Sequence, residues 1–250
     1  MKLESSDLST ICFQAFCVPK QGNSAAEYED ASAANVALGR FAIADGASES
    51  SFASLWARLL VEGFTHAPRR SISDTDWLEP LRQRWSAEVD KLELPWYADA
   101  KRGLGASATF LGLALRRYWK RRAGIWAASS VGDCCCFHIQ GDRPVQSFPV
   151  LHAQDFGNYP KLVNSRSHWN GSGAQDQFRG KWRAGDRFFL MTDALAQWFL
   201  MCHEKEDRPC DVIAQVLQAQ PEKSFCSWID ELRDQGNLRN DDVTLVVIDV

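Results

Sequence analysis

Aspartates at the ends of apolar segments are the feature that most constrains the fold of this sequence. Asp45, Asp133, Asp193 and Asp241 each lie at the end or the start of an apolar, strand-like segment. Strand ends on one side of a sheet meet at one surface, where clustered carboxylates repel each other unless cations neutralise them. Carboxylate oxygens are hard ligands that suit Mg²⁺ or Mn²⁺. The pattern therefore favours a divalent-cation site at one edge of a sheet-containing protein.

The same aspartates also have a simpler interpretation. Asp is common in turns and helix caps because its carboxylate accepts hydrogen bonds from nearby backbone N–H groups. Each of these residues, taken singly, fits that role. We assign it to Asp142, Asp186 and Asp211, which follow or precede turn-like sequence. Spacing and periodicity alone leave both interpretations open.

Apolar periodicity predicts one domain, residues 1–250, of mixed strands and helices. Helical spacing of apolar residues predicts helices over 48–66, 74–93, 194–204, 208–219 and 223–235. Ser48 or Ser50 is the expected N-cap of the first helix, and Asp74 that of the second. Shorter apolar segments predict strands over 11–20, 34–44, 106–118, 124–132, 134–140, 187–192 and 243–250. The polar stretch 152–180 is long for a connection, which predicts a functional flap or a mobile segment.

The charge balance argues against a nucleic-acid partner. Lys and Arg number 28 against 32 Asp and Glu, so the formal net charge is −4, whereas nucleic-acid-binding proteins carry positive surfaces. The first ten residues are polar, and no apolar run reaches the length of a membrane span. We therefore expect a cytoplasmic protein with neither a nucleic-acid nor a membrane partner.

The cysteines are expected to be structural. Three of the eight are consecutive, Cys134 to Cys136, and no Cys-x-x-Cys pair exists. Neighbouring residues of a strand face opposite sides, so these three thiols cannot all reach one metal. A chain without an export signal lives among reductants, and its cysteines then act as small buried apolar side chains.

The order of the motifs resembles the metal-dependent type 2C (PPM) Ser/Thr protein phosphatases, in the form of their minimal bacterial branch. Six stretches match in the expected order between about residue 11 and the C-terminus. They are Tyr28-Glu29-Asp30, Phe41-Ala42-Ile43-Ala44-Asp45-Gly46, Gly105-Ala106-Ser107-Ala108-Thr109, Ser130-Val131-Gly132-Asp133, Gly185 to Asp193, and Asn240-Asp241-Asp242-Val243-Thr244-Leu245-Val246-Val247. Each match alone is weak, and it is their order that makes the resemblance specific.

The resemblance implies an α+β fold, a four-layer αββα sandwich of two antiparallel β-sheets flanked by helices. It places the site at one edge of the sandwich. Asp45 would bridge two Mn²⁺ or Mg²⁺ ions, with the Gly46 carbonyl as another ligand. Asp193 and Asp241 would complete the coordination of one of these ions. Two such ions share a water and lower its pKa, and the resulting hydroxide attacks phosphorus in line. Asp45, Asp193 and Asp241 are thus the predicted catalytic residues.

The acidic pair near the N-terminus and Asp133 have lesser roles by the same resemblance. Glu29 or Asp30 would serve the second ion, directly or through water. Asp133 would belong to a third, weaker ion. The family's acidic partner for that third ion is Gln197 here, and its Asp-Gly step is Asp193-Ala194. Alanine is a mild change in helical backbone and an awkward one at positive φ.

One substrate-binding feature of the family is replaced. Its phosphate-gripping arginine, four residues before the Glu of the acidic pair, is Ala25 here. Lys20 is the nearest upstream cation and would bind the phosphate as a point charge, without the fork of arginine. The alternative for Lys20 is a solvated loop lysine.

Two functions follow from these residues. The first is a metal-dependent protein serine/threonine phosphatase, acting on phosphorylated protein substrates and paired by family analogy with a Ser/Thr kinase. The second is a catalytically weak or inactive type 2C-like module that binds a kinase or phosphoprotein. Retention of Asp45, Asp193 and Asp241 favours the first. The changes at Ala25, Ala194 and Gln197 favour the second.

Overall fold

Two antiparallel sheets form the centre of the molecule. The computed structural model describes residues 11–48, 50, 52–67, 77–92, 103–118, 122–157, 159–166 and 175–250. The first sheet has the strand order β1 (Cys12–Val18), β11 (Val243–Asp249), β10 (Asp186–Met191), β6 (Cys135–Gln140) and β7 (Arg143–Phe148). The second has the order β2 (Ala31–Asn35), β3 (Arg40–Gly46), β4 (Ser107–Arg117), β5 (Ala123–Val131) and β9 (Asp176–Arg183), with β8 (Val163–Asn164) paired to β4.

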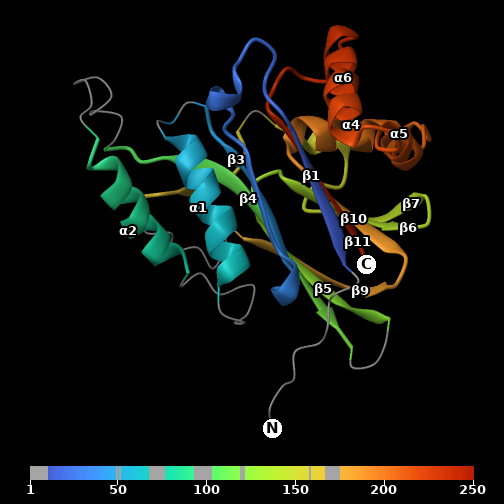
Figure 1. Ribbon diagram of the computed structural model, residues 1–250, viewed down its shortest axis with the longest axis horizontal. Coiled ribbons are helices and arrows are strands. Elements are labelled where there is room, and N and C mark those ends of the chain that lie inside the picture. Colours follow the sequence, from blue (N-terminus) through green and yellow to red (C-terminus); the bar gives the residue numbers. More distant parts are fainter. Residues whose placement is uncertain are drawn as a thin grey trace.

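Helices cover the outer faces of both sheets (Figure 1). The helices α1 (Ala53–His66) and α2 (Leu78–Val89) lie on the β3–β4 side. The opposite outer face is covered by α4 (Asp193–Glu204), α5 (Pro209–Val216) and α6 (Pro221–Asp234). Short 3₁₀ turns, η1 (Ala25–Glu27), η2 (Val36–Leu38) and η3 (Ala153–Asp155), lie in the connections. The predicted four-layer αββα sandwich is confirmed.

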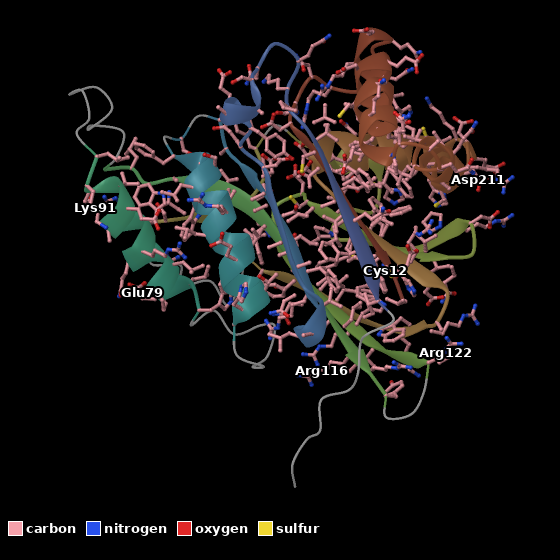
Figure 2. The ribbon with its side chains drawn as sticks, in the orientation of Figure 1. Cys12, Glu79, Lys91, Arg116, Arg122 and Asp211 are labelled. Atoms are coloured by element: carbon pink, nitrogen blue, oxygen red, sulfur yellow. The ribbon has the colours of Figure 1, made fainter. Side chains whose placement is uncertain are left out.

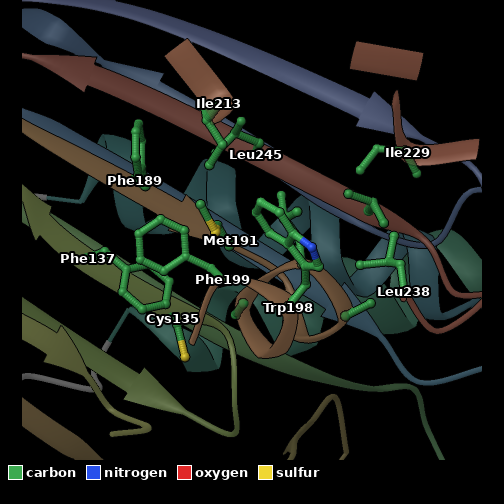
Figure 3. Close-up of a cluster of buried hydrophobic side chains, with 14 of the residues drawn as sticks. Cys135, Phe137, Phe189, Met191, Trp198, Phe199, Ile213, Ile229, Leu238 and Leu245 are labelled. Atoms are coloured by element: carbon green, nitrogen blue, oxygen red, sulfur yellow. The ribbon is translucent and has the colours of Figure 1, made fainter. Parts of the chain in front are cut away.

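Apolar side chains fill all three interfaces between the four layers. The interface between the sheets contains Phe41, Leu113, Trp126 and Phe188. The core beneath α4, α5 and α6 includes the labelled residues of Figure 3. Burial of this apolar surface is the main force that holds the layers together.

The consecutive cysteines follow the strand alternation that the sequence predicted. Cys134 and Cys136 lie in the core between the sheets, whereas Cys135 points into the core beneath α4. All three are buried free thiols. They pack as small apolar side chains, as expected.

Sequence periodicity located most of the elements, and its main error is at residues 31–46. The single strand expected over 34–44 is a hairpin, in which β2 ends at Asn35 and β3 begins at Arg40. Gly39 turns the chain at φ +62, where the sequence suggested a turn. The small side chains of β2 give no apolar alternation, so the strand was not recognised.

The first helix starts later than its sequence suggested. α1 begins at Ala53 after Phe52, whose φ is +62, and neither predicted serine caps it. Ser48 Oγ donates instead to Glu29 Oε2 at 2.5 Å, and Ser50 Oγ donates to the Ala47 carbonyl at 2.8 Å. The predicted cap of the second helix, Asp74, lies outside the described residues.

Part of the polar stretch 152–180 has regular structure. It contains η3, β8 and the beginning of β9, a strand from Asp176 to Arg183 that the sequence analysis did not predict. Residues 158 and 167–174 are outside the described residues, so the flap stays a prediction. Asp186, assigned to a turn, accepts hydrogen bonds from the Arg183 backbone N–H and from buried His138 Nε2, at 3.1 and 2.8 Å.

The outer surfaces carry charge. Glu79 on α2 and Asp211 on α5 lie on opposite sides of the molecule, and Arg116 and Arg122 lie at the ends of β4 and β5 drawn at the bottom (Figure 2). Among the described residues, no helix is long and apolar enough to cross a membrane.

Candidate metal centre

The strand registers bring one end of each sheet to the same edge of the sandwich. Met191, at the end of β10, pairs with Leu245 near the start of β11 and with Cys135 at the start of β6. In the other sheet, Ala31 at the start of β2 pairs with Ala44 near the end of β3. The segments that adjoin these strand ends carry the predicted carboxylates. This edge is the end opposite Arg116 and Arg122 in Figure 2.

Asp45 is at the centre of the cluster. It lies near the end of β3, opposite Thr109 of β4. Burial raises the pKa of the Asp45 carboxyl well above its usual value, and the charges of Asp30, Asp193, Asp241 and Asp133 raise it further, in that order. All five carboxylates therefore lie close enough for their charges to interact, whereas their roles as metal ligands stay a prediction.

Gly46 lets the acidic turn approach β3. A Cβ atom at this position would lie 2.8 Å from the Glu29 backbone carbonyl oxygen and 3.0 Å from the Ala53 Cβ. Both atoms are close to the backbone and cannot move away cheaply. The glycine therefore brings Glu29 and Asp45 together at one edge.

The acidic pair is held from the far end of the chain. Asp242 accepts hydrogen bonds from the backbone N–H groups of Lys20 and Glu29, both at 2.7 Å. Asp30 Oδ2 accepts from Thr244 Oγ1 at 2.8 Å. Residues beside β11 thus fix the segment between β1 and β2 against the site.

Asp30 and Asp133 are buried carboxyls whose charge is not fully compensated. Burial is the largest cause that raises the pKa of Asp30 to about 8, and Asp242 and Asp193 add to it. Burial and then Asp193 raise the pKa of Asp133 to about 7. One oxygen of each, Asp30 Oδ1 and Asp133 Oδ1, is buried without a hydrogen-bond partner.

Asp193 begins α4 and contacts an arginine. The Asp193 carboxylate accepts hydrogen bonds from the Ala194 backbone N–H and from Arg239 Nη2. Burial raises the pKa of Asp193, although Arg239 counteracts this. Arg239 Nε also lies 3.5 Å from Asp241 Oδ2. Arg239 thus spans two of the three predicted catalytic aspartates.

The donor set fits a divalent cation, although its oxygens are engaged elsewhere. Within the part of the chain that the structure describes, no three His, Cys, Asp or Glu side chains are grouped so as to hold a metal ion. Arg239 engages Asp193, and Ser48 engages Glu29. The unpartnered buried oxygens of Asp30 and Asp133 are costly as isolated carboxylates, so each group must either take up a proton or have its charge neutralised by a cation. Hard oxygen donors suit Mn²⁺ or Mg²⁺.

The structure resolves two of the departures noted in the sequence. Ala194 lies in the first turn of α4, where the backbone is helical, so alanine is a mild change. Gln197 donates from Nε2 to the Ala153 carbonyl oxygen of η3 at 3.4 Å. Lys20 lies near enough to Glu29 to counteract the raised pKa of that carboxyl, which burial causes.

Three contributors to the site were not predicted. Asp242 and Asn240 bind the segment that follows β1, Asn240 through its Oδ1, which accepts from the Gln21 N–H at 2.8 Å. Arg239 is the third. Their sequence signal was their position within or beside the last acidic motif, but their partners, Lys20, Gln21 and Asp193, are remote in sequence.

Comparisons with known proteins agree with this architecture. Among solved structures, PppA, described as a key regulatory component of the T6SS in Pseudomonas aeruginosa, superposes with a TM-score of 0.61 at 16% identity, covering 96% of this chain and 97% of its own. The catalytic domain of PstP, solved with two manganese ions, superposes with a TM-score of 0.60 at 15% identity, covering 96% of this chain and 97% of its own. Stp1 from Staphylococcus aureus superposes with a TM-score of 0.61 at 13% identity, covering 95% of this chain and 94% of its own. At such low identities, the superpositions show a shared fold and no more.

Membership of a family rests on the sequence model rather than on these superpositions. No curated protein matches the chain. The family model described as protein phosphatase 2C matches residues 25–234, which include the acidic pair, Asp45, Asp133 and Asp193. The chain therefore belongs to the protein phosphatase 2C family.

Proposed function

We propose that this protein is a metal-dependent protein serine/threonine phosphatase. The observation that carries the proposal is the carboxylate cluster around Asp45, in which buried oxygens of Asp30 and Asp133 lack a partner. Carboxyls whose pKa values are raised by burial and by neighbouring charges are candidates for a functional site. The family membership of the chain makes phosphate-ester hydrolysis the corresponding chemistry.

The carboxylates would bind up to three metal ions. Asp45, the Gly46 carbonyl, Asp193 and Asp241 would hold Mn²⁺ or Mg²⁺, Glu29 or Asp30 would serve a second ion, and Asp133 a weak third. When bound, such ions supply a hydroxide near neutral pH and neutralise phosphate charge. The PstP structure contains two manganese ions, which supports the count for that protein and suggests it here.

The chain's own groups bind and orient the substrate. Lys20 lies beside Glu29 at the rim of the site and supplies a positive charge for the substrate phosphate. Asp242 holds the Lys20 and Glu29 backbone in place. We infer that residues 1–250 act as one cytoplasmic domain on phosphorylated proteins, opposite a Ser/Thr kinase.

A purified preparation tests the proposal with a phosphothreonine peptide and p-nitrophenyl phosphate. We expect phosphate release with Mn²⁺ or Mg²⁺, none with EDTA, and loss of release in Asp193→Asn. A folded protein that releases no phosphate with either metal would contradict the proposal.

The second candidate is a phosphoprotein- or kinase-binding module without turnover. The Arg239–Asp193 pair favours it, since the pair neutralises a carboxylate that the metal needs. Tight phosphopeptide binding without phosphate release in Mn²⁺ would support this candidate, and efficient turnover would exclude it.

A further inference from the structure

Arg239 occupies the place of a cation in the carboxylate cluster. It follows α6 and precedes β11, and its Nη2 donates to Asp193 Oδ2 while its Nε lies 3.5 Å from Asp241 Oδ2. Among the described residues, these two carboxylates are its polar partners. They are the same two carboxylates that the family resemblance assigns to one metal ion.

The charges around Arg239 are strongly unbalanced. Burial lowers the pKa of its guanidinium, but Asp193, Asp241 and Asp133 outweigh burial and raise it overall. One guanidinium charge contacts two carboxylates and also interacts through space with Asp133, and Asp45 belongs to the same cluster. Arg239 therefore compensates the cluster in part and leaves room for further positive charge.

A guanidinium and a divalent cation that both bind the Asp193 carboxylate repel each other. The two positive charges would lie within a few ångströms of each other, and an arginine cannot lose its charge. Binding of the metal therefore weakens the contact of Arg239 with Asp193 and favours its displacement. Displacement needs only side-chain rotation, because 39% of the Arg239 side chain is exposed.

The backbone that carries Arg239 is held in place independently. Asn240 binds the Gln21 backbone through both its amide oxygen and its amide nitrogen. Arg233 Nη2 donates to the Asp241 carbonyl oxygen at 2.6 Å. The turn therefore keeps its shape while the Arg239 side chain moves.

We propose that Arg239 is an internal counter-ion that competes with the divalent metal for Asp193 and Asp241 and thereby weakens metal binding. The proposal rests on the proposed function, because it concerns regulation of the same site. The competition sets the metal concentration at which the site is loaded. It also compensates part of the negative charge of the cluster when the metal is absent.

Calorimetric titration of the full chain with Mn²⁺ tests the proposal, without any measurement of turnover. The variants are Arg239→Gln, which removes the charge, and Arg239→Lys, which keeps it. Arg187→Gln is the matched control, since Arg187 is also 39% exposed and bound to one carboxylate, Asp249, but lies outside the cluster. Thermal melts in EDTA and in Mn²⁺ give a second readout.

Competition predicts that Arg239→Gln binds Mn²⁺ about tenfold more tightly, the scale of one charge-assisted hydrogen bond. Arg239→Lys and Arg187→Gln should stay close to the wild type. The metal-free Arg239→Gln protein should melt lower, and Mn²⁺ should raise its melting temperature by more than it raises that of the wild type.

Two other outcomes overturn the proposal in distinguishable ways. If the wild type binds Mn²⁺ and Arg239→Gln binds it equally or more weakly, Arg239 is a structural residue and the proposed function is unaffected. If no folded variant binds Mn²⁺, the metal-dependent function fails, and the competition fails with it.

Discussion

Asp242 should be the residue that fixes the acidic pair against the metal centre. Its two carboxylate oxygens accept from the Lys20 and Glu29 N–H groups, both at 2.7 Å, and only 9% of the residue is exposed. Asp242→Ala removes both bonds and leaves two backbone donors without their acceptor. Residues 20 to 29 are then released from the turn before β11.

The magnitude follows from the hydrogen bonds lost. A hydrogen bond to a charged group contributes about 1.5–3 kcal/mol, and water can reach this partly exposed loop, so the pair should cost about 2–4 kcal/mol. At about 2–4 °C per kcal/mol for a domain of this size, the melting temperature should fall by roughly 5–15 °C. Mn²⁺ affinity should fall as well, because Glu29 and Asp30 lose their fixed position.

Thermal melts in EDTA, followed by circular dichroism, measure the effect. Asp142→Ala is the control, because Asp142 makes an exposed ion pair with Arg208, and loss of such a surface pair should change the melting temperature little. If Asp242→Ala melted as close to the wild type as Asp142→Ala does, Asp242 would not stabilise this segment and the reasoning would be refuted.

Further perturbations address pH, backbone conformation and substrate binding. The pKa of Asp30 in the folded protein, about 8, exceeds its unfolded value, so its stabilising contribution is complete below about pH 4 and is lost as the pH rises through 8. The melting temperature in EDTA should therefore fall over this pH range, and it should fall less in Asp30→Asn. An identical pH profile for the two proteins would contradict this. Gly132→Ala should lower the free energy of unfolding in urea by about 2–4 kcal/mol, because φ is +95 and the new Cβ would lie 2.7 Å from the Thr109 side chain. Gly141→Ala is the control, since its Cβ would enter open space, and it should cost clearly less. Equal losses in the two variants would oppose this reasoning. Lys20→Gln should raise the KM for a phosphopeptide several-fold with little change in kcat, and an unchanged KM would make Lys20 a solvated loop residue.

Much of the fold could be predicted because its elements have strong local patterns. The strand at 243–250 and the helix at 223–235 follow from apolar periodicity, and the structure has them as β11 and α6 with similar bounds. β2 was missed because its small residues give no such pattern. The start of α1 was misplaced because its N-cap is Phe52 in a left-handed conformation, which no capping preference indicates.

The carboxylates could be predicted from motif order, but their partners could not. Asp45, Asp193 and Asp241 come from separate strand ends, and the registers bring them to one edge. The contacts of Asp242 with Lys20 and of Arg239 with Asp193 join residues that are remote in sequence. Pairings of this kind depend on side-chain placement across sheets, which local periodicity does not encode.

Anomalous diffraction at the manganese edge, from crystals grown in Mn²⁺, tests the central claim most directly. The account predicts two strong peaks at the carboxylate cluster, with Asp45 between them, Asp193 and Asp241 on one of them, and Arg239 turned away from Asp193. A map with no peak at the cluster and Arg239 still bound to Asp193 would contradict the assignment of this edge as a metal centre.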